Sequence, residues 1–143
     1  MTGIVKAVCI SEEKGTAKRN VGRRELIEDF GLAGDAHAGK WHRQVSLLSQ
    51  EKIEAFRALG APVKDGDFGE NLIVSGMDLA KLPVGTRLTS GQVILEVTQI
   101  GKTCHNDCAI KEAVGTCIMP TEGIFARVIQ GGTIATGDVL VVV

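Results

Sequence analysis

The stretch "TRLTSGQVILEVTQI", residues 86–100, is the clearest indicator of fold class in this chain. Two apolar runs, Thr86 to Thr89 and Val93 to Ile100, flank a Ser90-Gly91 break. Short apolar runs separated by a glycine-containing break are typical of a β-hairpin. We therefore expect two strands here that pair with each other.

Similar short runs lie on both sides of this hairpin. The chain has 18 glycines and only 3 prolines, and the glycines separate the apolar runs from one another. Glycine at such positions marks turns between strands. The further strands expected on this basis are Ile4 to Ile10, Arg24 to Phe30, Gln44 to Leu48, Asn71 to Val74 and the closing residues 137–143.

Helical signals are fewer. Between Ser49, which can cap a helix, and Gly60, which can end one, apolar residues recur at every third position. Shorter helices are expected at Asn106 to Val114 and at Thr121 to Ile129. Because helices do not regularly alternate with the strands, the pattern favours a mainly β fold, an antiparallel barrel or sandwich with a few short helices. We expect one domain over residues 1–143.

Composition excludes several functional classes. The chain is 44% hydrophobic and 23% charged, as expected for a folded domain, and its formal net charge is -1. A nucleic-acid-binding protein usually has a strong excess of basic residues, so we do not expect this chain to bind nucleic acid.

No apolar stretch approaches the roughly 20 residues that span a bilayer, and the first residues lack the features of a signal peptide. We expect a soluble cytoplasmic protein without a membrane segment. The oligomeric state is not indicated.

Three of the four cysteines lie in "GKTCHNDCAIKEAVGTC", residues 101–117. Thiols stay reduced in the cytoplasm, so clustered cysteines there favour metal binding or catalysis over disulfides. Cys104, Cys108 and Cys117 are candidate metal ligands, although zinc sites usually have a second pair of ligands that this chain lacks. A buried apolar role is the other alternative, and we expect it for Cys9, which lies within an apolar strand.

Cys104 is the best candidate for a reactive thiolate. Lys102 and His105 flank it, and Asn106 can begin a helix just beyond it. Positive charge and a helix N-terminus both favour the thiolate, which is the reactive form in sulfur transfer and in metal ligation. Cys108 and Cys117 would then resolve a persulfide or complete a metal site.

Four motifs, in order along the chain, resemble those of the MOSC domain family, named for the C-terminal domain of molybdenum cofactor sulfurase. They are "GLAGDAH" at 31–37, "RQVSL" at 43–47 followed by Glu51, "FGENL" at 68–72, and "LEVTQ" at 95–99 leading to Cys104. The segment from Cys117 to Val128 resembles a compact stand-alone subgroup. Many members carry proline and arginine just before the signature cysteine, where this chain has Ile100, Gly101 and Thr103.

The resemblance implies a β-barrel that handles sulfur for the molybdenum cofactor (molybdopterin) or a related metal–sulfur centre. Cys104 would carry a persulfide or bind molybdenum. The chain has no room for a pyridoxal phosphate domain, so a cysteine desulfurase would donate sulfur in trans. The acceptor would be a molybdopterin-biosynthesis enzyme or a molybdoenzyme. A sulfurtransferase activity, a non-enzymatic metal-binding module and a docking partner of the biosynthetic enzymes remain alternatives.

Other candidate residues are polar groups near these motifs. His37 lies on a glycine-rich turn and is a candidate general base or hydrogen-bond donor. Asp35 on the same turn can also bond its own backbone. We expect Lys14 and Lys18 to be solvated, whereas cationic side chains further on suit an anionic ligand. The candidate cofactor-binding residues are Arg19, Arg23, Arg43, Asp35 and Asn71, with Asn71 also a candidate for supporting a loop and Arg43 for a surface pair with Glu51.

Overall fold

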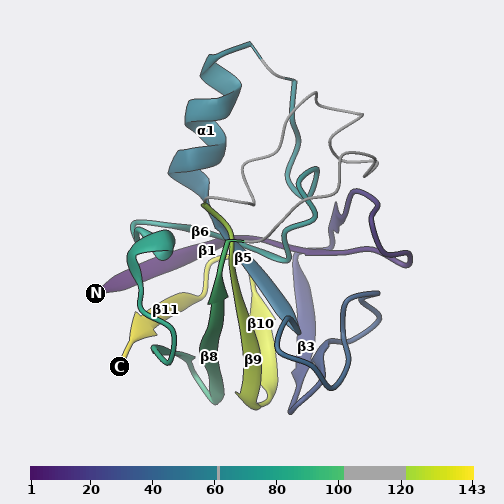
Figure 1. Ribbon diagram of the computed structural model, residues 1–143, viewed down its shortest axis with the longest axis vertical. Coiled ribbons are helices and arrows are strands. Elements are labelled where there is room, and N and C mark those ends of the chain that lie inside the picture. Colours follow the sequence, from purple (N-terminus) through teal and green to yellow (C-terminus); the bar gives the residue numbers. More distant parts are fainter. Residues whose placement is uncertain (61, 102–121) are drawn as a thin grey trace.

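The computed structural model describes residues 1–60, 62–101 and 122–143, and a closed β-barrel forms its centre (Figure 1). Among the described residues, strands follow one another around the ring in the order β11-β7-β8-β9-β5-β6-β1, and β1 pairs back with β11. The ring consists of β1 (Thr2–Ile10), β5 (Val45–Ser49), β6 (Leu72–Ser75), β7 (Arg87–Ser90), β8 (Val93–Ile100), β9 (Ile124–Gln130) and β11 (Val139–Val142).

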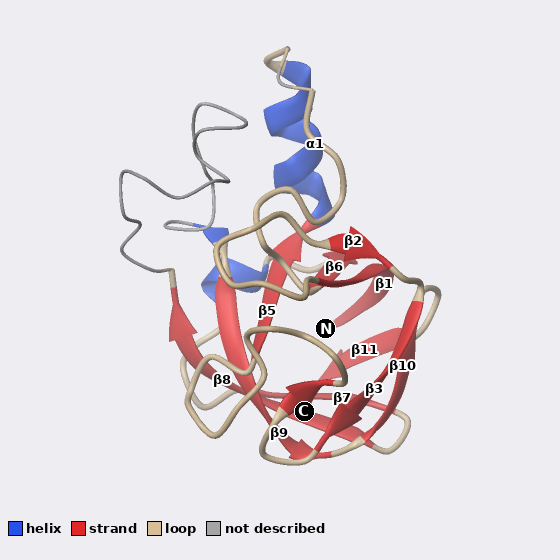
Figure 2. Cartoon of the chain, turned by 90° about the vertical axis from the view of Figure 1, so that its right-hand side faces the viewer, coloured by secondary structure: helices blue, strands red, loops and turns tan. Residues whose placement is uncertain are grey.

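Smaller elements surround the barrel. A separate sheet has the order β10-β3-β4, and β2 pairs with the end of β1. A helix, α1, projects from the barrel next to β5 (Figure 2). No helix in the described part of the chain is long and apolar enough to cross a membrane. These elements are β2 (Arg19–Asn20), β3 (Arg23–Ile27), β4 (Gly31–Leu32), β10 (Gly132–Ala135), α1 (Gln50–Ala58) and the 3-10 helix η1 (Leu79–Lys81).

The mainly β barrel expected from the sequence is confirmed. In the hairpin of residues 86–100, β7 and β8 pair antiparallel, with Ser90 opposite Val93. The C-terminal strand β11 pairs with both β1 and β7 and so closes the ring. Ring neighbours are antiparallel except β5 and β6, which run parallel.

Two apolar cores explain why β1, β5 and β6 alternate so poorly in hydropathy. Leu47 and Leu72 face the barrel interior. Leu48 and Ile73, their chain neighbours, belong to a second core that includes Ile53 of α1. Because both faces of these strands are covered, successive side chains are all apolar, as in a fully buried strand.

The helix expected at Thr121 to Ile129 is wrong. Residues 124–130 form β9, which pairs antiparallel with both β5 and β8. Apolar and β-branched side chains suit a strand buried between two neighbours, and this tertiary pairing overrides the weak helical pattern. Arg127, expected on that helix, is instead on the outer side of β9 and lies 3.7 Å from Glu96. The helix expected at Asn106 to Val114 lies outside the described residues.

Candidate functional site

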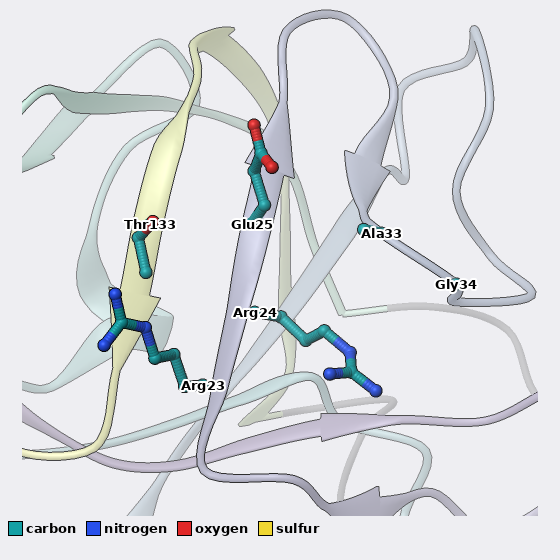
Figure 3. Close-up of a pocket in the computed structure, with 6 residues that line it drawn as sticks. All are labelled: Arg23, Arg24, Glu25, Ala33, Gly34 and Thr133. Atoms are coloured by element: carbon teal, nitrogen blue, oxygen red, sulfur yellow. The ribbon is translucent and has the colours of Figure 1, made fainter.

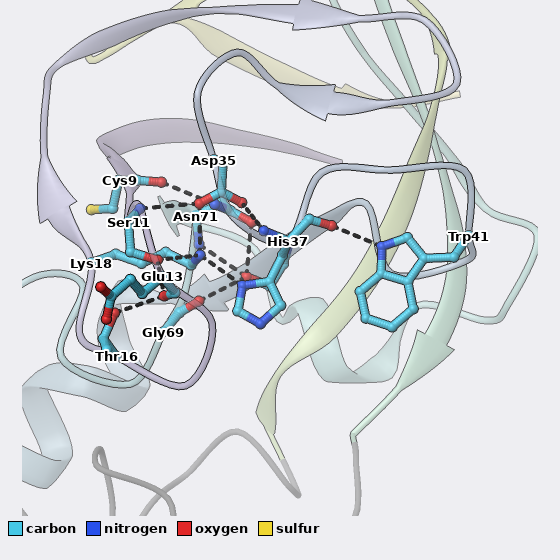
Figure 4. Close-up of polar contacts among 11 residues, drawn as sticks. Cys9, Ser11, Glu13, Thr16, Lys18, Asp35, His37, Trp41, Gly69 and Asn71 are labelled. Carbon is cyan, nitrogen blue, oxygen red and sulfur yellow. Dashed lines mark hydrogen bonds and ion pairs between the residues drawn. The ribbon is translucent and has the colours of Figure 1, made fainter.

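Two loops bring four polar residues together beside the end of β1, and we call them the Lys18 cluster: Ser11, Lys18, Asp35 and His37 (Figure 4). The Lys18 Nζ atom lies 2.7 Å from Asp35 Oδ1, 3.0 Å from His37 Nδ1 and 3.3 Å from Ser11 Oγ. The side chains of Lys18 and Asp35 are both 0% exposed. A buried ion pair of this kind has to satisfy its own hydrogen bonds, because water does not reach it.

Asp35 organises the cluster through both carboxylate oxygens. Its Oδ1 also accepts a hydrogen bond from the backbone N–H of Ser11 at 3.1 Å, and its Oδ2 accepts one from the N–H of His37 at 3.3 Å. The second bond is the local turn contact expected for an aspartate at this position. Burial lowers the pKa of Lys18, and the Asp35 carboxylate opposes that shift. The carboxylate therefore favours the charged form of Lys18.

A second buried carboxylate, that of Glu70, holds the backbone segment to which the Lys18 backbone is hydrogen-bonded. The N–H of Lys18 donates to the carbonyl oxygen of Gly66 at 2.8 Å. Glu70, which is 0% exposed, accepts 3.0 Å hydrogen bonds from the N–H groups of Gly66 and Phe68. Burial raises the pKa of Glu70 to about 7, although both backbone bonds act in the opposite direction.

Asn71 joins three strands of the barrel. Its side-chain oxygen accepts from the N–H of Ser46 at 2.9 Å, and its amide donates to the carbonyl oxygen of Cys9 at 3.0 Å. Asn71 is fully buried, so these bonds give it the supporting role that the sequence suggested as one alternative. Contact of Asn71 with a ligand stays a prediction.

An aromatic and cationic stack lies beside His37. Trp41 donates its indole N–H to the carbonyl oxygen of His37 at 2.8 Å (Figure 4). The Arg43 guanidinium carbon lies 4.7 Å from the Trp41 ring centroid and 5.6 Å from that of Phe125. Arg43 Nε is buried without a hydrogen-bond partner in the described part of the chain. The stacking orients the cation but leaves hydrogen-bonding capacity for an anionic group. Glu51, its alternative partner, instead accepts from the N–H of Gly76.

This loop is tied to the end of β8. His42 Nε2 lies 2.8 Å from Gln99 Oε1, and the Thr98 hydroxyl donates to the carbonyl oxygen of His42. At the same edge, the N–H of Gly101 donates to the carbonyl oxygen of Gly123 at 2.6 Å. Thus the loop that carries Arg43 is fixed at the edge of the barrel where β8 ends and β9 begins.

The structure does not bring every predicted residue to this cluster. Arg19 has a side chain 60% exposed and lies 4.0 Å from Glu12. Arg23 is on β3, where it lines an open depression with Thr133 of β10, and it points away from its neighbour Arg24 (Figure 3). Among the described residues, no hydrogen bond, ion pair or ring contact joins either Arg19 or Arg23 to the Lys18 cluster. Their role in binding a cofactor stays a prediction.

Of the cysteine predictions, only the one for Cys9 falls on described residues. Cys9 is buried with its thiol reduced, and burial raises its pKa to about 12, so the apolar role is confirmed. Cys104, Cys108 and Cys117 lie outside the described residues. In residues 1–60, 62–101 and 122–143, no three histidine, cysteine or acidic side chains gather closely enough to hold a metal.

Sequence reasoning missed two members of the site. The expectation that Lys18 is solvated is wrong, because Asp35 neutralises it in the interior. Trp41, which the sequence motifs do not include among the site residues, contacts both His37 and Arg43. No local motif marks Lys18, since its partner is 17 residues away. The run of basic residues around it is typical of an exposed loop.

The closed, mainly antiparallel β-barrel defines the fold class of the protein. The model of the MOSC domain matches residues 34–141, and the chain belongs to the MOSC domain family. This family is associated with functions like that of molybdenum cofactor sulfurase. No curated protein sequence matches the chain.

Solved structures share the fold. The YuaD protein from Bacillus subtilis superposes with a TM-score of 0.80 at 21% identity, covering 98% of this chain and 94% of that one. YiiM from Geobacillus stearothermophilus gives a TM-score of 0.74 at 20% identity, covering 99% and 75%. YiiM from Escherichia coli gives 0.72 at 20% identity, covering 100% and 70%. At such identities the likeness shows the fold alone.

Proposed function

We propose that this chain handles sulfur for the molybdenum cofactor or a related metal–sulfur centre, with Cys104 as persulfide carrier or molybdenum ligand. Membership of the MOSC family supports this role, because the family is associated with molybdenum cofactor sulfurase. Cys104 follows the fourth family motif, at the place of the signature cysteine. A cysteine desulfurase is the proposed donor, and a molybdopterin-biosynthesis enzyme or molybdoenzyme the proposed acceptor.

The observation that carries the proposal is the gathering of anion-binding groups at one edge of the barrel. His37 and Arg43 lie on the loop that His42 ties to Gln99, near the end of β8. Along the chain, Cys104 follows Gly101 by three residues. A thiolate and an anionic cofactor both benefit from cationic and N–H groups nearby.

The described residues fit an anionic cofactor. The buried Arg43 Nε has no hydrogen-bond partner in the described part of the chain, and the guanidinium is held by two aromatic rings. Such a preorganised cation suits a phosphate or an oxyanion. Arg43 and His37 would hold the molybdenum cofactor, which would supply the metal–sulfur chemistry. Trp41 would keep both of them in place.

Sulfur loading needs no external oxidant. The Cys104 thiolate would attack the outer sulfur of a persulfide on the desulfurase, forming a new S–S bond. The donor's S–S bond breaks, and its cysteine leaves as a thiolate. The persulfide sulfur moves from one cysteine to the other with no net change in oxidation state.

The test is a mass measurement after incubation with a cysteine desulfurase and free cysteine under anaerobic conditions. We expect one added sulfur atom on the parent chain and none on Cys104→Ser. Cys9→Ser is the matched control, because Cys9 is buried and its thiol stays protonated. Equal loading of the parent and Cys104→Ser would refute the carrier role.

Elemental analysis of chain purified without oxygen or chelator tests the alternative role of Cys104. Molybdenum that is lost in both Cys104→Ser and Arg43→Met would support the ligand role. Zinc that is lost in Cys108→Ser but kept in Arg43→Met would instead favour the metal-binding module built on the three cysteines.

A further inference from the structure

We propose that Lys18 is a positioning residue that keeps the imidazole of His37 neutral, with its proton on Nε2. Lys18 itself would not touch the ligand. The site would then offer an N–H donor at His37 rather than a general base. This inference rests on the proposed function only for the identity of the ligand.

The count of protons at Lys18 supports this assignment. The Ser11 hydroxyl donates its one proton to the carbonyl oxygen of Glu13 at 3.0 Å, so its oxygen accepts from Lys18. Asp35 receives hydrogen bonds from Lys18, from Ser11 N–H and from His37 N–H, as an ionised carboxylate does. An ammonium has three protons and no lone pair. The third proton therefore points to His37 Nδ1, which lies 3.0 Å away.

The ammonium form follows from the ion pair. Asp35 Oδ1 lies 2.7 Å from Lys18 Nζ, and both side chains are shielded from water. A neutral lysine would leave the Asp35 carboxylate buried without a countercharge, which costs more than the pair itself. Burial alone lowers the pKa of Lys18, but Asp35 favours its charge both by Coulomb attraction and by the hydrogen bond.

The backbone that carries the His37 imidazole is held in place on both sides. The N–H of His37 is held by Asp35 Oδ2 at 3.3 Å, and its carbonyl oxygen accepts from the Trp41 indole at 2.8 Å. The backbone of Lys18 is held in turn by Gly66. In Figure 4 the second ring nitrogen of His37 points away from the Lys18 cluster. Because Nδ1 accepts a hydrogen bond from Lys18, the proton of the neutral imidazole is on Nε2.

The chemical consequence concerns the ligand. A neutral imidazole with its proton on Nε2 donates one hydrogen bond and abstracts no proton from its partner. The ligand group that meets it must be an acceptor, such as a phosphate oxygen, an oxo group or a thiolate sulfur. The sequence left two roles for His37, general base or hydrogen-bond donor. The hydrogen bond from Lys18 favours the role of donor.

The experiment is 15N NMR of the full chain labelled at histidine and lysine, recorded at neutral pH without any ligand. We expect His37 to show a pyridine-like Nδ1 and a pyrrole-like Nε2, with a coupling through the hydrogen bond to Lys18 Nζ. His37→Gln assigns the signals. Because neither cofactor nor desulfurase is present, this result does not depend on the outcome of the persulfide test.

Variants of two lysines on the same loop test the cause. Lys18→Met removes the donor, and we expect the other tautomer or the imidazolium of His37 to appear. Lys14→Met is the matched control, because Lys14 is exposed and lies over the Trp41 ring at 5.5 Å. It should leave the His37 signals unchanged.

Three results would overturn the proposal. They are a proton on Nδ1 in the parent chain, an imidazolium in the parent chain at neutral pH, or identical His37 signals in the parent and in folded Lys18→Met. Should Lys18→Met fail to fold, the parent spectrum and its coupling to Lys18 still decide between these forms.

Discussion

The barrel interior and the Lys18 cluster are both buried, yet they are stabilised in different ways. The interior is filled by apolar side chains from every strand of the ring, which the sheet register brings together. The cluster is held by one ion pair and its hydrogen bonds between two loops. An apolar core tolerates changes that preserve volume. A buried polar network fails when one partner is lost, because the others stay desolvated.

The largest effect should come from removing the cation. Lys18→Met leaves Asp35 buried without its countercharge, and we expect a loss of about 4 kcal/mol in the free energy of unfolding. The matched change in the barrel interior is Leu95→Met, which preserves volume and should cost less than about 1.5 kcal/mol. Urea denaturation measures both. A smaller loss for Lys18→Met than for Leu95→Met would abolish the distinction between the regions.

The next largest loss of stability should come from Gly66, which packs against the backbone of Lys18. Gly66 has a φ of +92°, and an added Cβ would clash with the Lys18 carbonyl oxygen. We expect Gly66→Ala to cost about 3 kcal/mol through strain and this clash. Gly85 has nearly the same φ, +94°, with nothing within 4 Å, so Gly85→Ala isolates the strain, about 1 kcal/mol. Equal losses in thermal denaturation would show that contact with Lys18 does not matter.

A third effect depends on pH. Because burial raises the pKa of Glu70 from 4.5 to about 7, the folded chain binds a proton that the unfolded chain has already released. The free energy of unfolding should therefore fall as pH rises from 4.5 to 7, by about 3 kcal/mol at most. Asp65 adds to the shift of Glu70.

Glu70→Gln should remove that fall, measured by urea denaturation at pH 5 and pH 7.5. The control is Glu96→Gln, which changes a carboxylate near the surface of the barrel that pairs with Arg87 and Arg127. It should keep the pH dependence of the parent chain. If Glu70→Gln kept the pH dependence of the parent chain, a group other than Glu70 would be responsible for it.

The smallest effect should come from a charge outside both regions. Arg127 is 49% exposed and lies 3.7 Å from Glu96 on the outside of the barrel. Such surface pairs contribute about 0–1 kcal/mol. We expect Arg127→Ala to shift the denaturation midpoint little, and to shift it less as salt is added. A loss as large as that of Lys18→Met would mean that charge pairs count equally wherever they lie.

The difference between local and long-range interactions also explains which features could be predicted from the sequence. The β7–β8 hairpin, the closing strand and α1 follow from local signals: turn residues, apolar runs and a helical period. For the site, a glycine-rich turn indicated Asp35 and His37. Lys18 was misjudged because its burial depends on a partner that folding brings from another loop. The strand β9 was misjudged because pairing on both sides, rather than local preference, determines its conformation.

Trp41 gives this site a built-in optical signal. The chain has one tryptophan and no tyrosine, so its intrinsic fluorescence comes essentially from Trp41. That indole is hydrogen-bonded to the His37 backbone and stacked on the Arg43 guanidinium. An anion that draws Arg43 from the ring or moves the His37 backbone would change the emission. Ligands for this barrel can therefore be screened without labels, with a reporter that contacts the candidate site.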